Sequence, residues 1–226
     1  MKIEELNRLA SSRRRKRVWL WGGVVLVVLI VIGISVASVK SGGISTAVGD
    51  LSDPVTAADW QKGSTNPTAT IVEYSDFQCP ACGSYYSIIK ELLTKRPDVA
   101  LVYRHYPLPQ HLQAKIAATA AEAAGAQGKF WEMHDMLFDN QAVWSDKTSA
   151  PEIFIGYAAA LKLDLDQFRA DVASATTTTA INDDLASGRR SRVNSTPTFF
   201  IDGEQVNNPA GVDEFIKLID QTKNES

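Results

Sequence analysis

The chain begins with a long apolar stretch that differs from everything after it. Residues 18–39 carry no formal charge and consist mainly of Val, Leu and Ile, with two Trp residues near the start. At 1.5 Å per residue, a helix of this length would be roughly 33 Å long, against a hydrocarbon core of roughly 30 Å in a bilayer. The pattern therefore predicts a transmembrane helix over residues 18–39.

The charges around this stretch indicate its orientation. Residues 1–40 carry eight Lys or Arg and two Glu, and seven of the eight basic residues precede the apolar stretch. Because basic flanks stay on the cytoplasmic side, residues 1–17 are expected in the cytoplasm, with the rest of the chain outside the cell membrane. A cleaved signal peptide is the alternative, although its apolar region is usually only about 7 to 15 residues long. Both interpretations export the remainder of the chain.

After the apolar stretch, the pattern changes to a linker and then to a strand, a helix and a strand. Residues 40–67 are rich in Gly, Ser, Thr, Pro and Asp, which is typical of a tether, and a domain is predicted over residues 68–226. Residues 69–77 and 99–106 have the β-branched and aromatic character of buried strands. Between them, residues 79–96 place apolar side chains at helical spacing. Together they have the size of a parallel β-α-β crossover.

The second half of the domain is predicted to be mostly helical. Residues 108–190 have helical character throughout, and a run of four Thr is the least helix-like part. Residues 195–203 return to strand character, with a short further strand around residues 204–206. Residues 211–223 form an amphipathic helix. The predicted fold class is therefore α/β, with a small sheet interrupted by the helical insertion at about residues 108–190 and preceded by the transmembrane helix.

Composition and charge exclude several classes of protein. The 226 residues are 45% hydrophobic and 22% charged, with 14 Gly and 9 Pro, which rules out a disordered, collagen-like or polytopic membrane protein. After residue 40 the chain carries fifteen basic and twenty-four acidic residues, so nucleic acid is not expected as a partner. Two Cys are too few for a disulfide-stapled scaffold or a four-cysteine zinc site. The two cysteines must act as one pair.

The cysteines form a C-P-A-C motif at the predicted start of a helix. A thiol at a helix N-terminus faces free backbone N–H groups and the positive end of the helix dipole, and both lower its pKa. Pro80 suits the first turn, since its missing N–H needs no partner there. Cys82 lies nearly one turn further on and can attack a mixed disulfide on Cys79. We therefore predict a redox-active disulfide in which Cys79 is the nucleophile and Cys82 the resolving thiol.

Three other roles for the cysteines are open. A metal site would need two further ligands, and the three histidines, His105, His111 and His134, are scattered along the chain. A structural disulfide would close a loop of only four residues and would stabilise the domain little. Two idle buried thiols are unusual in an oxidising compartment. No metal and no cofactor other than the disulfide is expected.

The order of these motifs resembles the DsbA-like branch of the thioredoxin superfamily. The first strand, the sequence F-Q-C-P-A-C, the helical insertion and the sequence S-T-P-T-F-F follow one another as in that family, over roughly residues 60–223. The resemblance implies a thioredoxin-like fold and thiol-disulfide exchange. It also implies that Pro197 follows a cis bond beside the disulfide, and that Thr196 offers its backbone to an extended substrate. An ordinary strand entrance is the alternative for these two residues.

The resemblance also assigns roles to residues around the cysteines. Glu73 matches the buried acid of the family and could accept a proton from Cys82, with Arg104 as a charge partner that would keep it ionised. The alternative for Glu73 is a surface glutamate at a strand edge. Pro80 and Ala81 are expected to contact the substrate. Because the family's enterobacterial pattern has Pro-His at this place, its strong oxidising power is not carried over in full.

The sequence predicts a membrane-anchored, extracytoplasmic oxidase that donates the Cys79–Cys82 disulfide to exported proteins that are reduced or unfolded. Such an enzyme needs a membrane partner that reoxidises it. The same exchange run backwards would make the protein a reductase or an isomerase. A protein of a different class, a membrane-anchored chaperone-like binding module with a static disulfide, is the other alternative.

Overall fold

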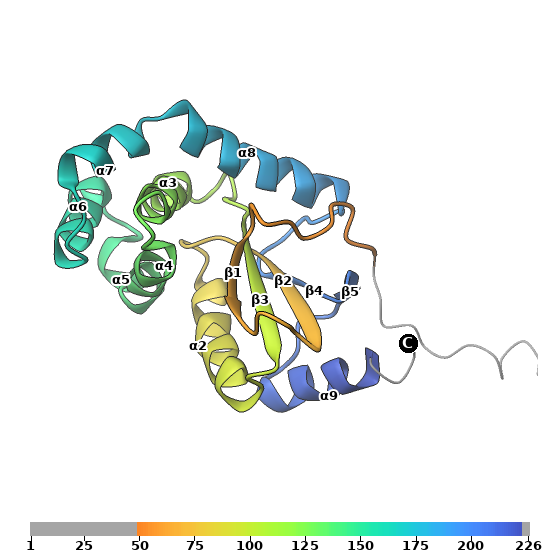
Figure 1. Ribbon diagram of the computed structural model, residues 1–226. Coiled ribbons are helices and arrows are strands. Elements are labelled where there is room, and N and C mark those ends of the chain that lie inside the picture. Colours follow the sequence, from red (N-terminus) through yellow and green to blue (C-terminus); the bar gives the residue numbers. More distant parts are fainter. Residues whose placement is uncertain (1–48, 223–226) are drawn as a thin grey trace, which may run out of the picture. The chain divides into compact units, whose positions relative to one another are not determined.

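A five-stranded mixed sheet with helices on both faces makes up the chain from residue 49 to residue 222 (Figure 1). The computed structural model describes these residues, and the predicted transmembrane helix at residues 18–39 lies outside them. Within residues 49–222, every helix is too short or too polar to cross a membrane.

The sheet is built around the predicted β-α-β unit. Its strands are β1 Trp60–Gly63, β2 Ala69–Ser75, β3 Val99–His105, β4 Thr198–Ile201 and β5 Glu204–Val206. They lie in the order β1-β3-β2-β4-β5, with β2 and β3 parallel and the other pairs antiparallel. Helix α2, Pro80–Lys95, connects β2 to β3. Three residues separate the end of the central strand β2 from the C-P-A-C motif.

One strand was not predicted. β1 lies within residues 40–67, which the sequence predicts to be a linker, so the sheet begins before the predicted start of the domain. Its four residues, W-Q-K-G, are mostly exposed and too few to show an alternating pattern. The strand exists because its backbone pairs with β3 from Trp60 opposite Tyr103 to Gly63 opposite Ala100. Backbone pairing of this kind does not require particular side chains, so the sequence does not predict it.

Side chains of β2 alternate between two cores, as the period of a strand requires. Ile71 packs on the face covered by α2 and by α9, Val212–Thr222. Val72 and Tyr74 pack on the opposite face, where α8, Ala175–Arg190, covers the sheet. Both faces of β2 are thus buried, which explains its nearly continuous apolar sequence. Any residue of β2 can be assigned to one face by its position alone.

Helices occupy most of the stretch that the sequence predicts to be a helical insertion. They are α3 Ala114–Gly125, α4 Phe130–Asp139, α5 Gln141–Trp144, α6 Ala150–Ala160, α7 Leu165–Val172 and α8. The Ala-rich helix α3 packs against α4, α6, α7 and α8, because its small side chains allow close approach. The Thr run is helical and belongs to the first turns of α8, where the Ser174 hydroxyl accepts a hydrogen bond from the backbone N–H of Thr177.

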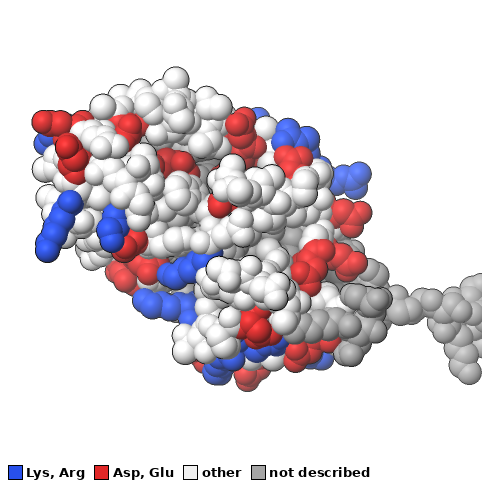
Figure 2. Space-filling view, viewed as in Figure 1, with Lys and Arg blue, Asp and Glu red and all other residues white. Residues whose placement is uncertain are grey.

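The described surface carries charges of both signs. On the face shown in Figure 2, acidic and basic side chains are interspersed, with uncharged surface between them. Two large hydrophobic side chains are strongly exposed among the described residues, Leu112 at 81% and Val143 at 54%. The side chain of Gln78 makes a hydrogen bond near each of them. Close to Leu112, its Oε1 accepts from the backbone N–H of Gln113 at 2.6 Å. Close to Val143, its Nε2 donates to the carbonyl of Ser145 at 2.6 Å. These apolar side chains therefore flank the segment just before Cys79.

Helix α8 approaches the sheet closely at Gly188, and this contact can be tested by substitution. A Cβ atom at Gly188 would lie 2.6 Å from Cε2 of Tyr106, a buried ring that cannot move aside cheaply. We expect Gly188→Ala to lower the free energy of unfolding by about 1 to 3 kcal/mol, measured by urea denaturation. The matched control is Gly156→Ala in α6, where a Cβ meets open space and alanine should stabilise the helix by about 0.5 to 1 kcal/mol. Equal stability of the two variants would contradict the close packing.

Candidate active site

The C-P-A-C motif lies at the N-terminus of α2, after the short turn that follows β2. Cys79 is the N-cap residue with extended backbone angles, and Pro80 is the first helical residue. The backbone N–H of Cys79 donates to the carbonyl of Asp76 at 3.0 Å, and Gly83 N–H donates to the carbonyl of Cys79 at 3.1 Å. Both cysteines are free thiols. Because Cys79 is 7% exposed and Cys82 is fully buried, Cys79 is the sulfur that a partner can reach.

The two thiols have opposite pKa shifts. A hydrogen bond with the Cys82 thiol lowers the pKa of Cys79 to about 5, with Thr196 and the backbone N–H groups of Ala81 and Cys82 acting in the same direction and burial opposing them. Burial raises the pKa of Cys82 well above its ordinary value, and the hydrogen bond with Cys79 and the charge of Glu73 raise it further. At pH 7 a thiol with a pKa of about 5 is roughly 99% thiolate, whereas an ordinary thiol is roughly 3% thiolate. The reduced site therefore carries its negative charge on Cys79.

Thr196 and Pro197 lie beside Cys79, although more than a hundred residues separate them in the chain. The peptide bond between them is cis, as the resemblance implies. When Cys79 is protonated, its thiol donates to the carbonyl oxygen of Thr196, with 3.4 Å between sulfur and oxygen. The carbonyl of Pro197 accepts a hydrogen bond from Asn208 Nδ2 at 2.9 Å, just before β4 begins. The backbone around Thr196 is therefore held against the sulfur.

Glu73 is buried in the sheet on the side covered by α2. It lies two residues from Ile71 on β2, which places both on the same face, and only 3% of it is exposed. Burial raises the pKa of Glu73 to about 7. Its charge in turn raises the pKa of Cys82, so the two side chains are electrostatic neighbours. The alternative of a surface glutamate is therefore wrong.

The predicted ion pair between Glu73 and Arg104 is also wrong. In the parallel register of β2 and β3, Arg104 is the partner of Tyr74, so it lies on the face opposite Glu73. Its guanidinium pairs with Asp59 at 2.7 Å and donates to the Tyr74 hydroxyl at 2.9 Å. No ion pair between described residues includes Glu73. Its carboxyl group therefore titrates without a neighbouring cation.

Asp76 organises the turn before the cysteines, and the sequence analysis did not identify it. Its buried carboxylate accepts hydrogen bonds from the backbone N–H groups of Gln78 at 2.7 Å and Leu108 at 2.8 Å, and from Nδ1 of His111 at 2.7 Å. Its own N–H donates to the sulfur of Cys82 at 3.5 Å. A signal was present, since an Asp that follows a strand often accepts the N–H two residues on. Asp76 thus joins the active-site turn to the segment before α3.

Two further polar side chains of this region were not predicted, Ser75 and Tyr103. Both are buried, and within the described part of the chain neither hydroxyl has a hydrogen-bond partner. Nothing in the sequence distinguishes them from ordinary strand residues. They become noticeable only when the register of β2 and β3 is known, because Tyr103 is then opposite Glu73.

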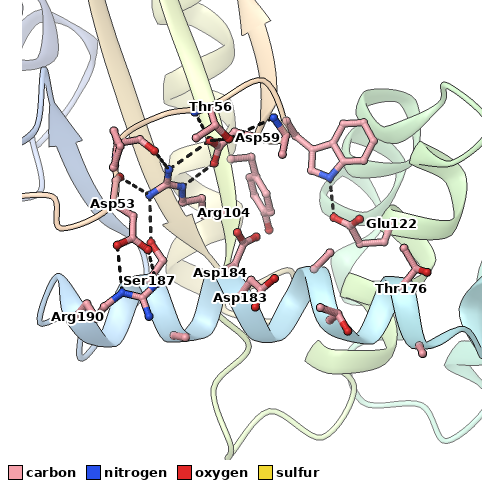
Figure 3. A pocket seen from close by; sticks show the side chains of 18 residues that line it. Asp53, Thr56, Asp59, Arg104, Glu122, Thr176, Asp183, Asp184, Ser187 and Arg190 are labelled. Carbon is pink, nitrogen blue, oxygen red and sulfur yellow. Dashed lines mark hydrogen bonds and ion pairs between the residues drawn. The ribbon is translucent and has the colours of Figure 1, made fainter.

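A separate cavity of about 710 Å³ lies beside α8, the end of β3 and the segment before β1 (Figure 3). Neither cysteine lines it. Several of its carboxylates have partners: Asp53 pairs with Arg190, and Glu122 accepts hydrogen bonds from the side chains of Trp60 and His105. Burial raises the pKa of Asp184, also in its wall, to about 6. Across residues 49–222, no cluster of His, Cys, Asp and Glu side chains has the arrangement of a metal site.

Comparison with known proteins agrees with this geometry. A family model described as Thioredoxin matches residues 56–221. Among solved structures, the chain is similar to a thioredoxin-like oxidoreductase from Silicibacter pomeroyi, with 24% identity and a TM-score of 0.64 over 81% of this chain and 99% of that one. It is also similar to oxidised BdbD from Bacillus subtilis, with 22% identity and a TM-score of 0.66 over 77% and 97% of the two chains. For DsbA2 from Pseudomonas aeruginosa the identity is 26% and the TM-score 0.59, over 75% and 97%.

Curated relatives match one segment of longer proteins. The chain is 42% identical over 165 residues to Na(+)/H(+) antiporter NhaA 1 from Salinispora arenicola, which covers 72% of this chain and 24% of that protein. The identity to Na(+)/H(+) antiporter NhaA 3 from Salinispora tropica is 39% over 173 residues, covering 76% and 26%. This chain thus spans about a quarter of the length of these relatives. Transport is an activity named for the longer proteins.

The acidity of Cys79 can be measured directly. In the reduced full-length chain, we expect thiolate absorbance at 240 nm to disappear with a midpoint near pH 5, since the pKa of Cys79 is lowered to about 5. Cys79→Ser should remove this titration. Cys82→Ala should shift the midpoint upward, because the hydrogen bond with Cys82 is the largest cause of the lowering. A midpoint near 8.5 in the wild-type chain would contradict the assignment of Cys79 as the activated thiol.

The same group makes the stability of the reduced protein depend on pH. A thiol whose pKa is lower in the folded state stabilises the fold fully above its unfolded pKa, and this contribution is lost as pH falls through the folded pKa. The contribution of Cys79 should therefore decrease between about pH 8.5 and 5, and Cys79→Ser should lack it.

Proposed function

The chain belongs to the thioredoxin family, and on that premise we propose that it is a thiol-disulfide oxidoreductase that works as an oxidase of exported proteins. Exchange of thiols and disulfides is the general activity that the fold and its DsbA-like structural neighbours imply. The direction of exchange, the site residues, the compartment and the partners are parts of the proposal. Each is supported below by a separate observation.

The main support for an oxidase over a reductase is the lowered pKa of Cys79, about 5. A stabilised thiolate favours the reduced form of the site, so the disulfide form accepts electrons readily from a substrate. The same thiolate is a good leaving group when a mixed disulfide is resolved by a second substrate thiol. In a reductase the attacking thiol must instead hold a mixed disulfide long enough for Cys82 to complete the reaction, and the buried thiol of Cys82 is a weak nucleophile at neutral pH.

The reaction proceeds in two exchanges. A substrate thiolate attacks the sulfur of Cys79, the Cys79–Cys82 bond breaks, and Cys82 leaves with the electron pair and takes up a proton. A second substrate thiolate then attacks the substrate sulfur of the mixed disulfide, and Cys79 leaves as a thiolate. The substrate gains a disulfide, the protein keeps two electrons as a dithiol, and Glu73 is the group that supplies the proton to Cys82.

Substrate contact is assigned to the surface around Cys79. Pro80 and Ala81 are exposed at the first turn of α2. The backbone of Thr196 lies within hydrogen-bond reach of Cys79 and offers an edge along which an extended chain could pair. The exposed side chains of Leu112 and Val143 add apolar surface nearby. A substrate that is still unfolded can supply both a free backbone edge and apolar side chains.

Location and partners follow from the part of the sequence before the domain. The predicted helix at residues 18–39 would anchor the protein in the cell membrane with its N-terminus in the cytoplasm. The thiol site would then face the oxidising side, where a membrane partner reoxidises the dithiol. No cofactor beyond the Cys79–Cys82 disulfide is needed, because each half-reaction exchanges one disulfide for two thiols.

The trapped intermediate distinguishes an enzyme from a binding module. With Cys82→Ser, the Cys79 thiolate can still attack a disulfide of a substrate or partner, but the neighbouring thiol that would release the adduct within the molecule is missing, so mixed disulfides through Cys79 should accumulate in cells. Non-reducing electrophoresis followed by mass spectrometry measures them. The control Cys79→Ser should trap nothing, because it removes the attacking sulfur. A binding module with a static disulfide would give no adducts with either variant and would keep its binding.

The redox potential decides the direction of exchange. Equilibration of the purified full-length chain with glutathione should give a potential above about −200 mV, closer to strong protein oxidants at about −120 mV than to thioredoxin at about −270 mV. The reason is the stabilised thiolate of Cys79. A potential near −270 mV would favour the reductase and would remove the oxidase proposal. At each ratio of reduced to oxidised glutathione, mass spectrometry of alkylated thiols gives the oxidised fraction of the protein.

A further inference from the structure

Four polar side chains meet in a buried cluster beside the C-P-A-C motif. Glu73 and Ser75 lie two residues apart on β2 and so point to the same face. Tyr103 is the register partner of Glu73 on β3. Cys82 reaches the cluster from α2, and its sulfur accepts the N–H of Asp76, the residue after Ser75. All four side chains are almost completely buried. We call Glu73, Ser75, Tyr103 and Cys82 the buried cluster.

Two members of the buried cluster have hydroxyl groups without partners. Neither Ser75 Oγ nor Tyr103 Oη has a hydrogen bond of normal geometry to any other described residue. Buried polar groups in native proteins nearly always have a partner, because losing water without compensation is unfavourable. The unpaired hydroxyls of Ser75 and Tyr103 are therefore unfavourable for folding. A role in the chemistry is one reason for a protein to keep such groups beside a reactive thiol.

Ser75 is the one member of the buried cluster that acts on all three of the others. Burial raises the pKa of Glu73, of Cys82 and of Tyr103, and in each case the nearby Ser75 hydroxyl partly offsets the rise. Its position agrees with this, because it lies two residues from Glu73 on the same face of β2 and directly before Asp76, whose N–H meets the sulfur of Cys82. A serine hydroxyl can donate one hydrogen bond and accept two, and it rotates freely. These are the properties of a group that takes a proton on one side and releases one on the other.

We propose that the Ser75 hydroxyl relays the proton between Glu73 and Cys82 during disulfide exchange. The inference rests on the proposed function and names a residue for one step of it. When Cys82 leaves the disulfide with the electron pair, Ser75 gives its proton to that sulfur and takes the carboxyl proton of Glu73. The sulfur ends as a thiol, Ser75 is unchanged, and Glu73 ends as a carboxylate. The steps run in reverse when Cys82 attacks a mixed disulfide.

The surroundings of Glu73 determine the pH range of the relay. Within the cluster, Glu73 acts on Cys82 and on Tyr103, and Cys82 acts on Tyr103. From outside it, Cys79 at the start of α2 acts on Cys82, and Asp76 acts on Tyr103. The ring of Tyr103 also packs edge-on against His134 of α4, whereas β4 places the apolar Phe199 opposite Glu73. Since the pKa of Glu73 is about 7, its carboxyl can donate below pH 7 and accept above it.

The relay is tested by reduction of the oxidised full-length chain with dithiothreitol between pH 5.5 and 8.5. The rate is expressed per dithiothreitol thiolate, and thiols are counted by alkylation and mass spectrometry. The wild-type rate should decrease above pH 7 as Glu73 loses its proton. Ser75→Ala should be roughly tenfold slower below pH 7 and should lose this inflection, since a missing proton relay slows the exchange. Alanine fits within the space of serine, so the fold should be kept.

Three comparisons make the result specific to the hydroxyl. Ser75→Thr retains a hydroxyl and should restore both the rate and the inflection. Glu73→Gln should be slow, and adding Ser75→Ala to it should cause no further loss, because both changes interrupt one path. Tyr157→Phe is the matched control, because the hydroxyl of Tyr157 in α6 is also buried without a partner and burial alone perturbs it. Its rate and pH profile should equal those of the wild type.

Any of three results would overturn the relay. Ser75→Ala could keep the wild-type rate and inflection, Ser75→Ala and Ser75→Thr could be equally slow, or the losses of Ser75→Ala and Glu73→Gln could multiply in the double variant. Tyr103→Phe adds a fourth: if it alone abolished the inflection, the phenol would be the relay. Failure of the proposed function has a different signature, since the wild-type chain itself would then form no mixed disulfide through Cys79.

Discussion

Burial of a thiol and a carboxyl group without a counter-ion is the constraint on which the site depends. Cys82 and Glu73 lie side by side under the first turn of α2, and desolvation disfavours the charged form of each. The negative charge of the reduced site is therefore most stable on Cys79, where helix N–H groups and the Cys82 thiol stabilise it. The proposed roles of Cys79 as the outer nucleophile and Cys82 as the inner resolving thiol follow from this unequal solvation.

The remaining structure keeps that arrangement in place. Arg104 lies on the face of the sheet opposite Glu73. It binds the segment before β1 by donating to the carboxylate of Asp59 and to the carbonyl of Pro54. On the near face, the carboxylate of Asp76 and the side chain of Gln78 bind the active-site turn to the helical insertion. The insertion is thus connected to the turn that precedes Cys79.

The sequence predicted the strand-helix-strand unit and the cysteine motif well, because periodicity and helix N-terminus chemistry are local properties. It was less successful with residues whose meaning depends on register. Opposite charges on neighbouring strands led to the predicted pair of Glu73 and Arg104. The register of two parallel strands depends on the helix that connects them, and here Arg104 is opposite Tyr74, so the two charged side chains lie on opposite faces of the sheet. Ser75 and Tyr103 were missed for the same reason. The contact between Cys79 and Thr196 could be expected only from the resemblance, since no local physics connects residues so far apart.

The exposure of only one sulfur has a kinetic consequence. Every partner, whether it delivers electrons or removes them, must meet the site at Cys79, since Cys82 is enclosed. In the proposed oxidase, a protein to be oxidised and a partner that restores the disulfide would therefore compete for the same atom and could not be bound to it together. The protein must alternate between them in a ping-pong cycle. An excess of either partner occupies the site at the expense of the other, so throughput depends on the balance of the two concentrations.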